Sequence, residues 1–441
     1  MKITLPEKVD RILDTLMQAG YEAYAVGGCV RDSILGKEPQ DWDITTSAKP
    51  EEVKSIFRKT IDTGIEHGTV TVMLEREGFE VTTYRIDGKY EDSRHPKEVT
   101  FTPNLLEDLK RRDFTINAMA YNNRDGLVDA FDGMGDLKRQ IIRCVGNPLE
   151  RFDEDALRMM RAVRFAAQLG FSIETQTLAA IKELAPTLAK ISAERIQVEL
   201  IKLLLSKHPE EMRTLYETGI TAVMLPEFDA MMETKQNNPH HRYTVGEHTI
   251  VALQNIPQER VLRLTMLLHD VAKPVCKTED EEGIHHFYNH PKVGSEMAEK
   301  ILRRLKFDND TMRKVCNLVK WHDDNPPVTE KNIRRAIVRL GEEAYPAIFA
   351  VKRADILAQS DYQQEEKLHY VDAYESCYED VIKKKQCLSL KDLAVSGADL
   401  IAAGMKPGKE MGKVLKEMFE IVLEEPEKNT KEILMELVKK E

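Results

Sequence analysis

Residues 24–46, YAVGGCVRDSILGKEPQDWDITT, constrain the fold more than any other stretch of the chain. They predict a short apolar strand stopped by Gly27 and Gly28, then one or two helical turns, and a second strand that begins at Asp41. Alternate side chains of a strand point the same way, so Asp41 and Asp43 are expected to project from one face. The stretch therefore predicts a strand–turn–helix–strand unit with a pair of acidic groups.

This unit carries the groups that phosphate chemistry needs. Two carboxylates held close together repel each other unless a positive charge lies between them. Mg²⁺ takes carboxylate oxygens and keeps positions open for phosphate oxygens, so Asp41 and Asp43 are predicted to bind it. The backbone N–H groups of the turn at Gly28 suit a phosphate, and Arg31 adds a positive charge. An isolated D-x-D is commonly a solvated turn, but the ordered combination predicts nucleotidyl transfer.

The pattern GG-x-x-R-D followed by D-x-D resembles the class II tRNA nucleotidyltransferases and bacterial poly(A) polymerases of the polymerase-β superfamily. The resemblance covers nearly the whole chain. It implies an α+β fold in which a small α/β nucleotidyltransferase head with a mixed β-sheet precedes an all-α neck, body and tail. The expected parts are the head at 1–140, a neck that recognises the nucleotide base at 141–220, a body with an HD phosphohydrolase-like module at 221–375, and a tail that contacts tRNA at 376–441.

The composition predicts a cytoplasmic protein of several domains. The chain has 441 residues, of which 42% are hydrophobic, and it has no apolar run long enough to span a bilayer. Its start lacks the apolar core of a signal peptide, and its six cysteines are scattered, as expected of reduced thiols. A net charge of −11 argues against indiscriminate nucleic-acid binding, so an RNA partner would need local basic patches. No membrane and no obligatory protein partner are inferred.

Two β-rich runs at 68–74 and 79–85 predict a hairpin that turns at Glu77 and Gly78. The strand that starts with Glu80 is expected to lie beside the strand of the two aspartates. The resemblance implies that Glu80 is the third carboxylate of the catalytic site. The alternative is an exposed glutamate at the end of a strand.

Residues 86–104 are polar and contain glycine and proline, which predicts a loop. In the family that the chain resembles, a flexible loop at this place is needed to add A. The segment RRDFTINA that follows matches the family's RRDFTxNA motif. Arg112 is expected on the phosphates or sugar of the nucleotide, because the guanidinium fork suits phosphate. Asp113 and Asn117 are expected to hold the local structure or the ribose.

The neck segment 151–169 predicts one long helix, in which Asp155 and Arg158 share a face. Such a pair is ordinarily a surface ion pair worth under about 1 kcal/mol. The EDALR sequence, however, resembles the class II motif in which Asp and Arg imitate Watson–Crick partners. A carboxylate accepts from the exocyclic amine of C or A, and a guanidinium donates to the ring. Arg161 stays near that face, whereas Arg164 is expected to meet phosphates or RNA from another direction.

A second set of polar residues follows the order H…HD…H…H…D, which resembles the HD phosphohydrolase superfamily. Its members are His248, His269, Asp270, His290, His322 and Asp355. These side chains bind divalent transition metals such as Ni²⁺, Mn²⁺ or Fe²⁺, which would activate water against a phosphate ester. A single buried histidine is more often structural, but six candidates in family order predict a metal centre. The remaining histidines of this region match no ligand position and are taken as loop residues; they are His240, His241, His285 and His286.

Lysines line one side of a helix predicted at about 411–424, namely Lys409, Lys413 and Lys416. They are either a solvated face or a contact with the tRNA backbone, to which lysine adds salt-dependent affinity without sequence specificity.

Together with these motifs, the resemblance implies a template-independent CCA-adding enzyme that uses CTP and ATP, with Mg²⁺, on the 3′ end of tRNA, and that also carries an HD phosphohydrolase activity. An A-adding enzyme or a poly(A) polymerase has the same motifs and stays open as an alternative. A rival of another class is a metal phosphohydrolase with a non-catalytic head. A pure RNA-binding protein is disfavoured, because binding needs neither D-x-D nor HD.

Overall fold

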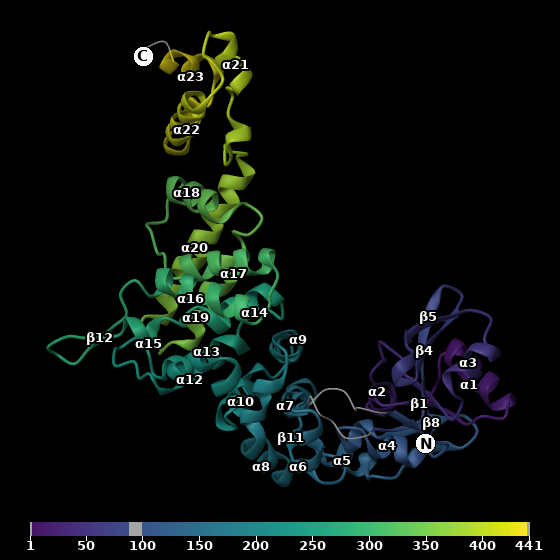
Figure 1. Cartoon of the computed structure of the whole chain (residues 1–441). Helices are drawn as coiled ribbons and strands as arrows, with labels where there is room; N and C mark the ends of the chain where they lie inside the picture. The colour runs from purple at the N-terminus through teal and green to yellow at the C-terminus, as the bar shows by residue number, and fades with distance from the viewer. Residues whose placement is uncertain (1, 88–98, 439–441) are drawn as a thin grey trace. The chain divides into compact units, whose positions relative to one another are not determined.

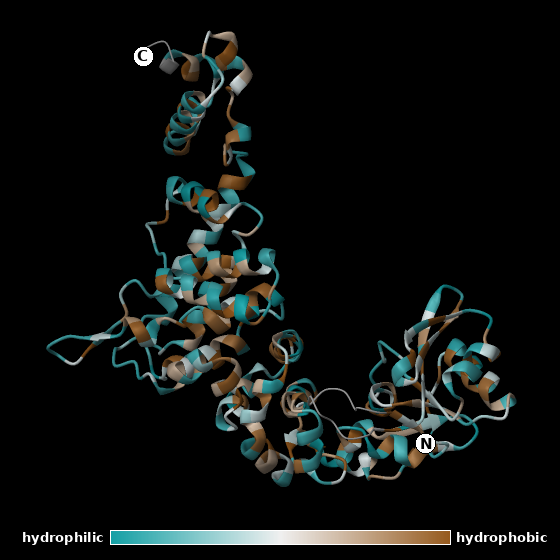
Figure 2. Cartoon of the chain, in the orientation of Figure 1, coloured by the Kyte–Doolittle hydropathy of each residue, from teal (hydrophilic) through white to brown (hydrophobic). Residues whose placement is uncertain are grey.

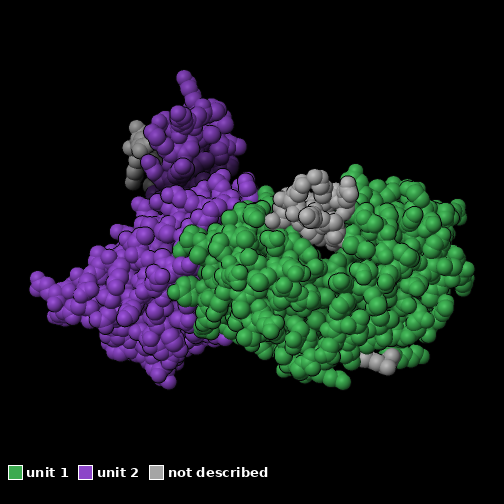
Figure 3. All heavy atoms as spheres, turned by 60° about the horizontal axis from the view of Figure 1, so that its bottom comes forward, with its two compact units in different colours: residues 1–226 green, residues 227–441 purple. Residues whose placement is uncertain are grey.

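The computed structural model describes residues 2–87 and 99–438. The chain divides into two compact units, one ending at Pro226 and the other beginning at Glu227 (Figure 3). The first unit contains a large β-sheet followed by helices, and the second is built mainly from helices (Figure 1). This arrangement confirms the predicted α+β class.

The head is built on a seven-stranded sheet with the order β3-β4-β5-β2-β1-β8-β9. Strands β2 and β5 are parallel and the other neighbours are antiparallel, so the sheet is mixed, as predicted. The strands are β1 (Ala23–Val26), β2 (Ile44–Thr46), β3 (Thr60–Gly64), β4 (Thr69–Leu74), β5 (Glu77–Thr83), β8 (Met119–Asn122) and β9 (Gly126–Asp129).

Helices cover both faces of this sheet. On one face, α1 (Glu7–Gln18) and α3 (Pro50–Ile56) pack on the strands through a shared apolar cluster (Figure 2). Helix α1 buries Val9, Ile12, Leu13 and Leu16, a spacing that places them on one side of a helix. On the opposite face, α4 (Leu105–Lys110) packs Leu105 and Leu109 against Tyr24, Val26 and Tyr84. Successive residues of β1 thus serve opposite faces.

The β4–β5 hairpin turns at Glu75 and Arg76, so the prediction of a turn at Glu77 and Gly78 was wrong. Both turn residues have positive φ angles, of 51° and 74°. Gly78 instead belongs to β5 and pairs with Met73 of β4. Two-residue hairpin turns of this kind favour Asn and Gly, and here the sequence supplies neither. Strand β5 consequently begins at Glu77 rather than at Glu80.

The expected single helix at 151–169 is broken in two, so that prediction was wrong. Helix α6 (Pro148–Glu154) is capped by Asn147 and ends before Asp155, whose backbone is extended with φ −145° and ψ 103°. Helix α7 (Leu157–Leu169) then ends at Gly170, which has the left-handed conformation common after a helix. The rest of the neck is α8 (Thr175–Leu184), α9 (Ala193–Leu204), α10 (Met212–Glu217) and α11 (Ile220–Met224).

Helices of the second unit pack their apolar side chains into shared buried clusters. They are α12 (Pro226–Glu233), α13 (Val245–Gln254), α14 (Arg260–Leu268), α15 (Lys273–Cys276), α16 (His290–Arg304), α17 (Asn309–Trp321), α18 (Glu330–Leu340), α19 (Ala347–Ala358) and α20 (Gln364–Lys383). The last three are α21 (Gly397–Ala402), α22 (Lys409–Glu424) and α23 (Lys431–Val438). No helix in the described parts of the chain combines the length and apolar character needed to cross a bilayer.

Smaller elements complete the chain. They are α2 (Gly28–Ile34), α5 (Gly133–Arg139), and the paired short strands β6 (Arg85–Asp87) with β7 (Val99–Phe101), β10 (Ile141–Ile142) with β11 (Ser172–Ile173), and β12 (Thr278–Glu279) with β13 (His285–His286). The loop predicted at 86–104 thus starts and ends in the β6–β7 pair, and residues 88–98 lie outside the described residues. All six cysteines are free thiols.

Candidate nucleotidyl-transfer site and metal centre

The two aspartates of the D-x-D pattern lie directly before a strand. Strand β2 begins at Ile44, so the expectation that Asp41 starts the strand was wrong. The backbone still extends the pairing by one step, because the N–H of Val26 donates to the carbonyl of Asp43 over 3.0 Å. Asp43 therefore lies at the end of β1, where the glycine turn begins. The side chains of Asp41 and Asp43 are both exposed.

The glycine turn is packed against Arg112. Gly27 has φ 83° and ψ −128°, a conformation that side chains with a Cβ rarely adopt, and α2 begins at the next residue, Gly28. A Cβ on Gly27 would lie 3.1 Å from Nη1 of Arg112. The sequence therefore needs glycine at 27 both for the turn and for the close approach of this guanidinium.

Arg112 lies among acidic groups and is largely buried. Its Nη2 is 3.5 Å from Oδ2 of Asp108, and its Nε is buried without a hydrogen-bond partner. Burial lowers the pKa of Arg112, while the nearby Asp108 opposes that change. The pKa of Asp43 is raised: burial raises it most, Arg112 opposes this change, and the negative charge of Asp41 adds to it. The arrangement places one cation between the glycine turn and the exposed carboxylates.

Arg31 is held by partners within the head. It donates to Oδ1 of Asn117 over 2.7 Å and to the carboxylate of Asp32 over 2.8 and 3.0 Å. Asn117 in turn donates to Asp113 over 3.3 Å, which agrees with the expectation that these two residues hold the local structure. Arg31 thus ties the helix after the glycine turn to the RRDFTINA segment.

Glu80 lies on the strand next to the aspartates. Ile44 pairs with Val81 in parallel register. One step back along both strands, the same register places Asp43 beside Glu80. Glu80 is exposed. The expectation that its strand lies beside that of the aspartates is thus confirmed. The ligand atoms of Asp41, Asp43 and Glu80 are not among the described groups that gather within 4.8 Å of one another.

The head and the neck are joined by an ion pair between Asp113 and Arg161. Oδ2 of Asp113 lies 2.6 Å from Nη2 and 2.7 Å from Nε of Arg161. Burial alone would raise the pKa of Asp113, but Arg161 and Arg158 lower it to about 2. Arg161 therefore has a partner in the head as well as a place on the neck helix.

The side chains of Asp155 and Arg158 pair with other residues, although the backbone N–H of Arg158 donates to the carbonyl of Asp155 over 3.0 Å. Asp155 precedes α7, so the expectation that the two share a helix face was wrong. The carboxylate of Asp155 instead accepts the N–H of Leu157 over 3.0 Å and lies 2.6 Å from Nη2 of Arg195. Arg158 pairs with Glu154 over 2.5 Å.

Arg195, on α9, is a residue that the sequence gave no reason to choose. Its contact with Asp155 spans 40 positions of the chain. No local pattern encodes such a pair, although an arginine near the start of an amphipathic helix is a weak pointer. Nearby, Arg164 is buried and donates to Glu199 and Gln168 over 2.8 Å each. This inward position does not suit the expected contact of Arg164 with phosphates or RNA.

In the second unit, the structure gathers all six residues of the H…HD…H…H…D order in one buried cluster. One group contains His248, His269 and Asp270, and a second contains Asp270, His290 and His322; the ligand atoms of each lie within 4.8 Å of one another. Asp355 joins the first group, with Oδ1 2.8 Å from Nε2 of His248. Asp270 therefore lies between two sets of histidines.

Each histidine of the cluster is oriented by the backbone. Nδ1 of His248 lies 3.2 Å from the carbonyl oxygen of Ala358, and Nδ1 of His269 lies 2.8 Å from that of Met266. Nδ1 of His290 lies 2.8 Å from the carbonyl oxygen of Phe287, and Nδ1 of His322 lies 2.7 Å from that of Val319. A histidine that donates from Nδ1 presents Nε2 as the ligand atom, the arrangement usual around protein-bound metals. Nitrogen and carboxylate donors in this proportion suit a divalent transition metal.

The charges in the cluster are strongly coupled. Burial would raise the pKa of Asp270, but His269 and Lys273 hold it well below its usual range. Burial would also lower the pKa of His269, but Asp270 and Asp355 raise it to about 10. Burial would likewise raise the pKa of Asp355, but His248 and His269 hold it well below its usual range, so both carboxylates stay ionised, as metal ligands must.

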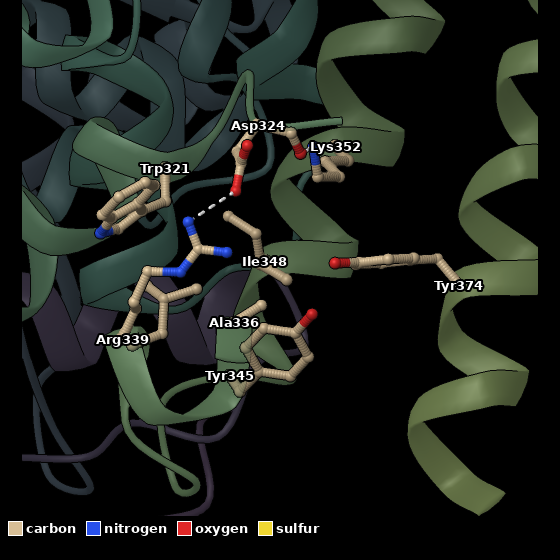
Figure 4. A pocket seen from close by; sticks show the side chains of 9 residues that line it. Trp321, Asp324, Ala336, Arg339, Tyr345, Ile348, Lys352 and Tyr374 are labelled. Carbon is tan, nitrogen blue, oxygen red and sulfur yellow. Dashed lines mark hydrogen bonds and ion pairs between the residues drawn. The ribbon is translucent and has the colours of Figure 1, made fainter. Parts of the chain in front are cut away.

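Lys352 supports the segment that carries His322. Its Nζ donates to the carbonyls of His322 and Asp324 over 3.0 and 2.7 Å, and burial lowers the pKa of this lysine to about 8. Figure 4 shows Asp324 between Lys352 and Arg339, which pairs with Asp324 over 3.3 Å and lies over the ring of Trp321. These contacts fix the end of α17, from which His322 projects.

His241 also belongs to this site, which the sequence did not predict. Its ring centroid lies 5.2 Å from that of His248. It lines two pockets of about 360 and 470 Å³ that both reach His322 and Asp355. Only long-range packing brings the loop before α13 here, so a pattern of ligand spacings could not have shown it.

Comparisons with known proteins agree with the head and neck. Residues 23–143 match the poly A polymerase head domain, 170–232 match the family described as a probable RNA and SrmB-binding site of polymerase A, and 277–438 match the putative domain 2 of tRNA nucleotidyltransferase. The CCA-adding enzyme of Limosilactobacillus reuteri is 38% identical over 97% of this chain and 94% of its own length. That of Enterococcus faecalis is 38% identical over 96% and 93%.

Solved structures are similar over the whole length. The Bacillus stearothermophilus CCA-adding enzyme in complex with CTP has a TM-score of 0.73 and 30% identity, covering 99% of both chains. The Thermotoga maritima CCA-adding enzyme complexed with tRNA has a TM-score of 0.59 and 21% identity over 100% of both chains, which shows a shared fold. The chain therefore belongs to the CCA-adding enzymes, the class II tRNA nucleotidyltransferases of the polymerase-β superfamily.

Proposed function

We propose that this protein adds C, C and A to the 3′ end of tRNA from CTP and ATP, without a nucleic-acid template. Relatives that are 38% identical over nearly the full length carry this name. The observation that carries the proposal is the position of the Asp41–Asp43 pair. It lies at the end of a strand pair, beside a glycine turn that packs on a partly unpaired arginine.

In the reaction, the 3′-hydroxyl oxygen of the RNA forms a bond to the α-phosphorus of the nucleotide, and the bond to pyrophosphate breaks. Exposed carboxylate oxygens fit Mg²⁺, and Asp41 and Asp43 would hold it. Bound Mg²⁺ supplies positive charge at the attacking and leaving oxygens. Glu80, on the adjacent strand, completes the acidic set.

The head offers two groups to the phosphates or the sugar of the nucleotide. No described residue accepts a hydrogen bond from the buried Nε of Arg112, so a phosphate or ribose oxygen can accept from it. The turn before Gly28 supplies backbone N–H groups at a helix start.

Base choice falls to Asp155 and Arg158. Each carboxylate oxygen has two acceptor positions, so Asp155 can accept the amine of C or A while it keeps Arg195. Arg158 carries five donors in a fixed fork, and its pair with Glu154 restrains the direction of that fork. This arrangement favours bases that present an amine beside a ring acceptor on the Watson–Crick edge, which C and A do and U and G do not.

Substitution of the metal pair tests the catalytic assignment. The Asp43→Ala protein should lose nucleotide incorporation and keep its fold by circular dichroism. Asp62→Ala is the matched control, because Asp62 is an exposed aspartate of strand β3 in the head, and its partner among the described residues is Lys54. Incorporation at more than a few per cent of the wild-type rate in Asp43→Ala would contradict the assignment.

We also infer a second activity, a metal-dependent phosphohydrolase in the HD module. The observation that favours it is the convergence of four backbone-oriented imidazoles and two ionised carboxylates in a buried cluster. His248, His269, Asp270 and Asp355 would hold one transition metal such as Ni²⁺, Mn²⁺ or Fe²⁺, and Asp270, His290 and His322 a second. A metal of this kind lowers the pKa of bound water and so supplies a nucleophile at neutral pH.

The substrates proposed for this module are RNA ends blocked by a 2′,3′-cyclic phosphate or a terminal phosphate. A water oxygen bonds to phosphorus, one ester P–O bond breaks, and the proton goes to the released ribose oxygen. Removal of the remaining phosphate leaves the 3′-hydroxyl that the head needs. The module would therefore repair the substrate of the head.

The two activities should be separable. Asp270→Ala should lose hydrolysis of 2′,3′-cyclic AMP and bound transition metal, yet keep nucleotide addition to an intact 3′-hydroxyl. Asp43→Ala should do the reverse. A wild-type protein that binds no transition metal and hydrolyses no 2′,3′-cyclic AMP would reduce the HD module to a structural part of the body.

A further inference from the structure

One wall of the HD pocket is aromatic. The pocket of about 360 Å³ is lined by Asp270, His290 and His322 on its metal-binding side and by His286 and Tyr288 at another part of its wall. A phosphate group alone occupies a small part of such a volume, whereas pockets of this size hold small organic ligands. The wall beyond the metal-binding residues is therefore available to the rest of the substrate.

The aromatic wall consists of two stacked rings. The centroids of His286 and Tyr288 are 5.4 Å apart, and their planes differ by 8°. Nε2 of His286 lies 2.7 Å from Oδ2 of Asp280, across the β12–β13 turn, so the imidazole is fixed in orientation. Tyr288 is 68% exposed, so its largely apolar ring is accessible from solvent.

The geometry points to a base-binding subsite. We propose that the stacked pair of His286 and Tyr288 binds the nucleoside base of the substrate whose phosphate enters the HD pocket. Aromatic rings stack on any nucleobase and so bind it without choosing a sequence. The proposal rests on the phosphohydrolase function inferred above and adds to it the residues that bind the base of the nucleotide substrate.

The charges near the pocket suit the same substrate. Lys273 lies between the two parts of the wall, with Nζ 2.8 Å from Oδ2 of Asp270 and 5.4 Å from the ring centroid of Phe287. It places a cation next to the metal-binding carboxylate, where a substrate phosphate arrives. A nucleotide bound here has its anionic end at Lys273 and its base at Tyr288.

A second exposed tyrosine provides the comparison. Tyr362 is 50% exposed and meets His240 edge-on, with centroids 5.0 Å apart and planes at 65°. The rings of this pair are not parallel, and Tyr362 is not among the residues that line the pocket of about 360 Å³. Tyr362→Ala is therefore the matched control for Tyr288→Ala.

Kinetics on two substrates test the subsite. Full-length protein with Mn²⁺ is assayed on 2′,3′-cyclic AMP and on the base-free analogue 1-O-methylribose 2,3-cyclic phosphate. Stacking on a base is worth enough that Tyr288→Ala should raise KM for 2′,3′-cyclic AMP by roughly 5- to 150-fold. KM for the base-free substrate should not change, kcat should stay near the wild-type value, and Tyr288→Phe should behave as wild type.

Binding without metal gives an independent readout. The metal-free protein should quench the fluorescence of 2-aminopurine riboside 3′-phosphate, and Tyr288→Ala should lose part of that quenching while Tyr362→Ala keeps it. Equal quenching and an equal KM in wild type and Tyr288→Ala would overturn the subsite but leave the hydrolase intact. A larger effect of Tyr362→Ala would place the base elsewhere. A wild-type protein that hydrolyses neither substrate would contradict the hydrolase function and the subsite with it.

Discussion

The carboxylate of Asp155 lies 2.6 Å from Nη2 of Arg195, whereas Arg158 pairs with Glu154. The two residues proposed to read the base are thus each held by a different neighbour. Arg195 fixes the direction of the Asp155 oxygens, which makes it a positioning residue for base choice. Arg195 is not one of the residues proposed to bind Mg²⁺ in the head.

Arg195→Ala should therefore weaken discrimination between nucleotides without removing catalysis. A carboxylate that loses the arginine to which it is hydrogen-bonded samples several orientations, so we expect KM for CTP to rise about 10-fold while kcat stays within a few-fold of wild type. Arg195→Lys should restore part of the loss, because it keeps the charge but not the fork. Steady-state kinetics with CTP and UTP measure KM, kcat and the discrimination between the two nucleotides for each variant. In Arg195→Ala, an unchanged KM with a strongly reduced kcat would show that Arg195 acts on the structure instead.

Arg158→Ala should relax base choice more strongly. A good bidentate contact to a base carries roughly 1–3 kcal/mol of discrimination, so incorporation of UTP or GTP should rise relative to CTP by about 5- to 150-fold. At saturating Mg²⁺, Arg158→Ala should still incorporate nucleotides, which would show that the metal site is retained. Unchanged ratios among the four nucleotides in Arg158→Ala would exclude a direct role of this residue in reading the base.

The Asp113–Arg161 pair predicts a pH-dependent contribution to stability. The pKa of Asp113 is about 2 in the folded protein and about 4 in an unfolded chain, a difference worth about 2 kcal/mol. A depressed carboxyl pKa stabilises the fold above the unfolded value, and this stabilisation is lost as pH falls from about 4 towards 2. Chemical denaturation of wild type and Asp113→Asn should differ by about that amount at pH 7, by less as pH falls below about 4, and should converge only near pH 2 and below. A difference that is independent of pH would contradict the ion pair.

Lys352 predicts a link between packing and metal binding in the HD module. Lys352→Met should release the segment after α17 that carries His322, and should lower metal affinity about 10- to 100-fold, as loss of an outer support around metal ligands does. Nucleotide addition by the head should be unchanged. Lys367→Met is the control, because Lys367 lines the same pocket of about 470 Å³ but bonds to His240 and Gln359. Equal metal affinity in Lys352→Met and wild type, measured by competition with a chelator, would refute the link.

The parts of the fold that depend on neighbouring residues were predictable. The strand before Gly27, the helix that starts at Gly28 and the mixed sheet all follow from apolar periodicity and glycine placement. The six ligand candidates of the HD module were found by residue type and order, and their gathering in one cluster agrees with that prediction.

Features that depend on distant residues were not predictable. The segment around Asp155 contains good helix formers, so nothing local indicates the break, and the partner that holds Asp155 is on another helix. The turn at Glu75 and Arg76 uses residues that rarely favour positive φ angles. His241 enters the metal site through a loop whose course is set by packing, not by spacing along the chain.

Primer extension on a defined tRNA end tests the central claim most directly. Purified wild-type protein with Mg²⁺ is given a tRNA transcript that ends before CCA, together with CTP alone, ATP alone, UTP alone, GTP alone, or CTP and ATP together, and the 3′ ends are sequenced. The account predicts two C residues with CTP alone, CCA with both nucleotides, and little incorporation of U or G. Addition of A directly to this end, or of a long A tract, would contradict CCA addition and identify an A-adding enzyme or a poly(A) polymerase.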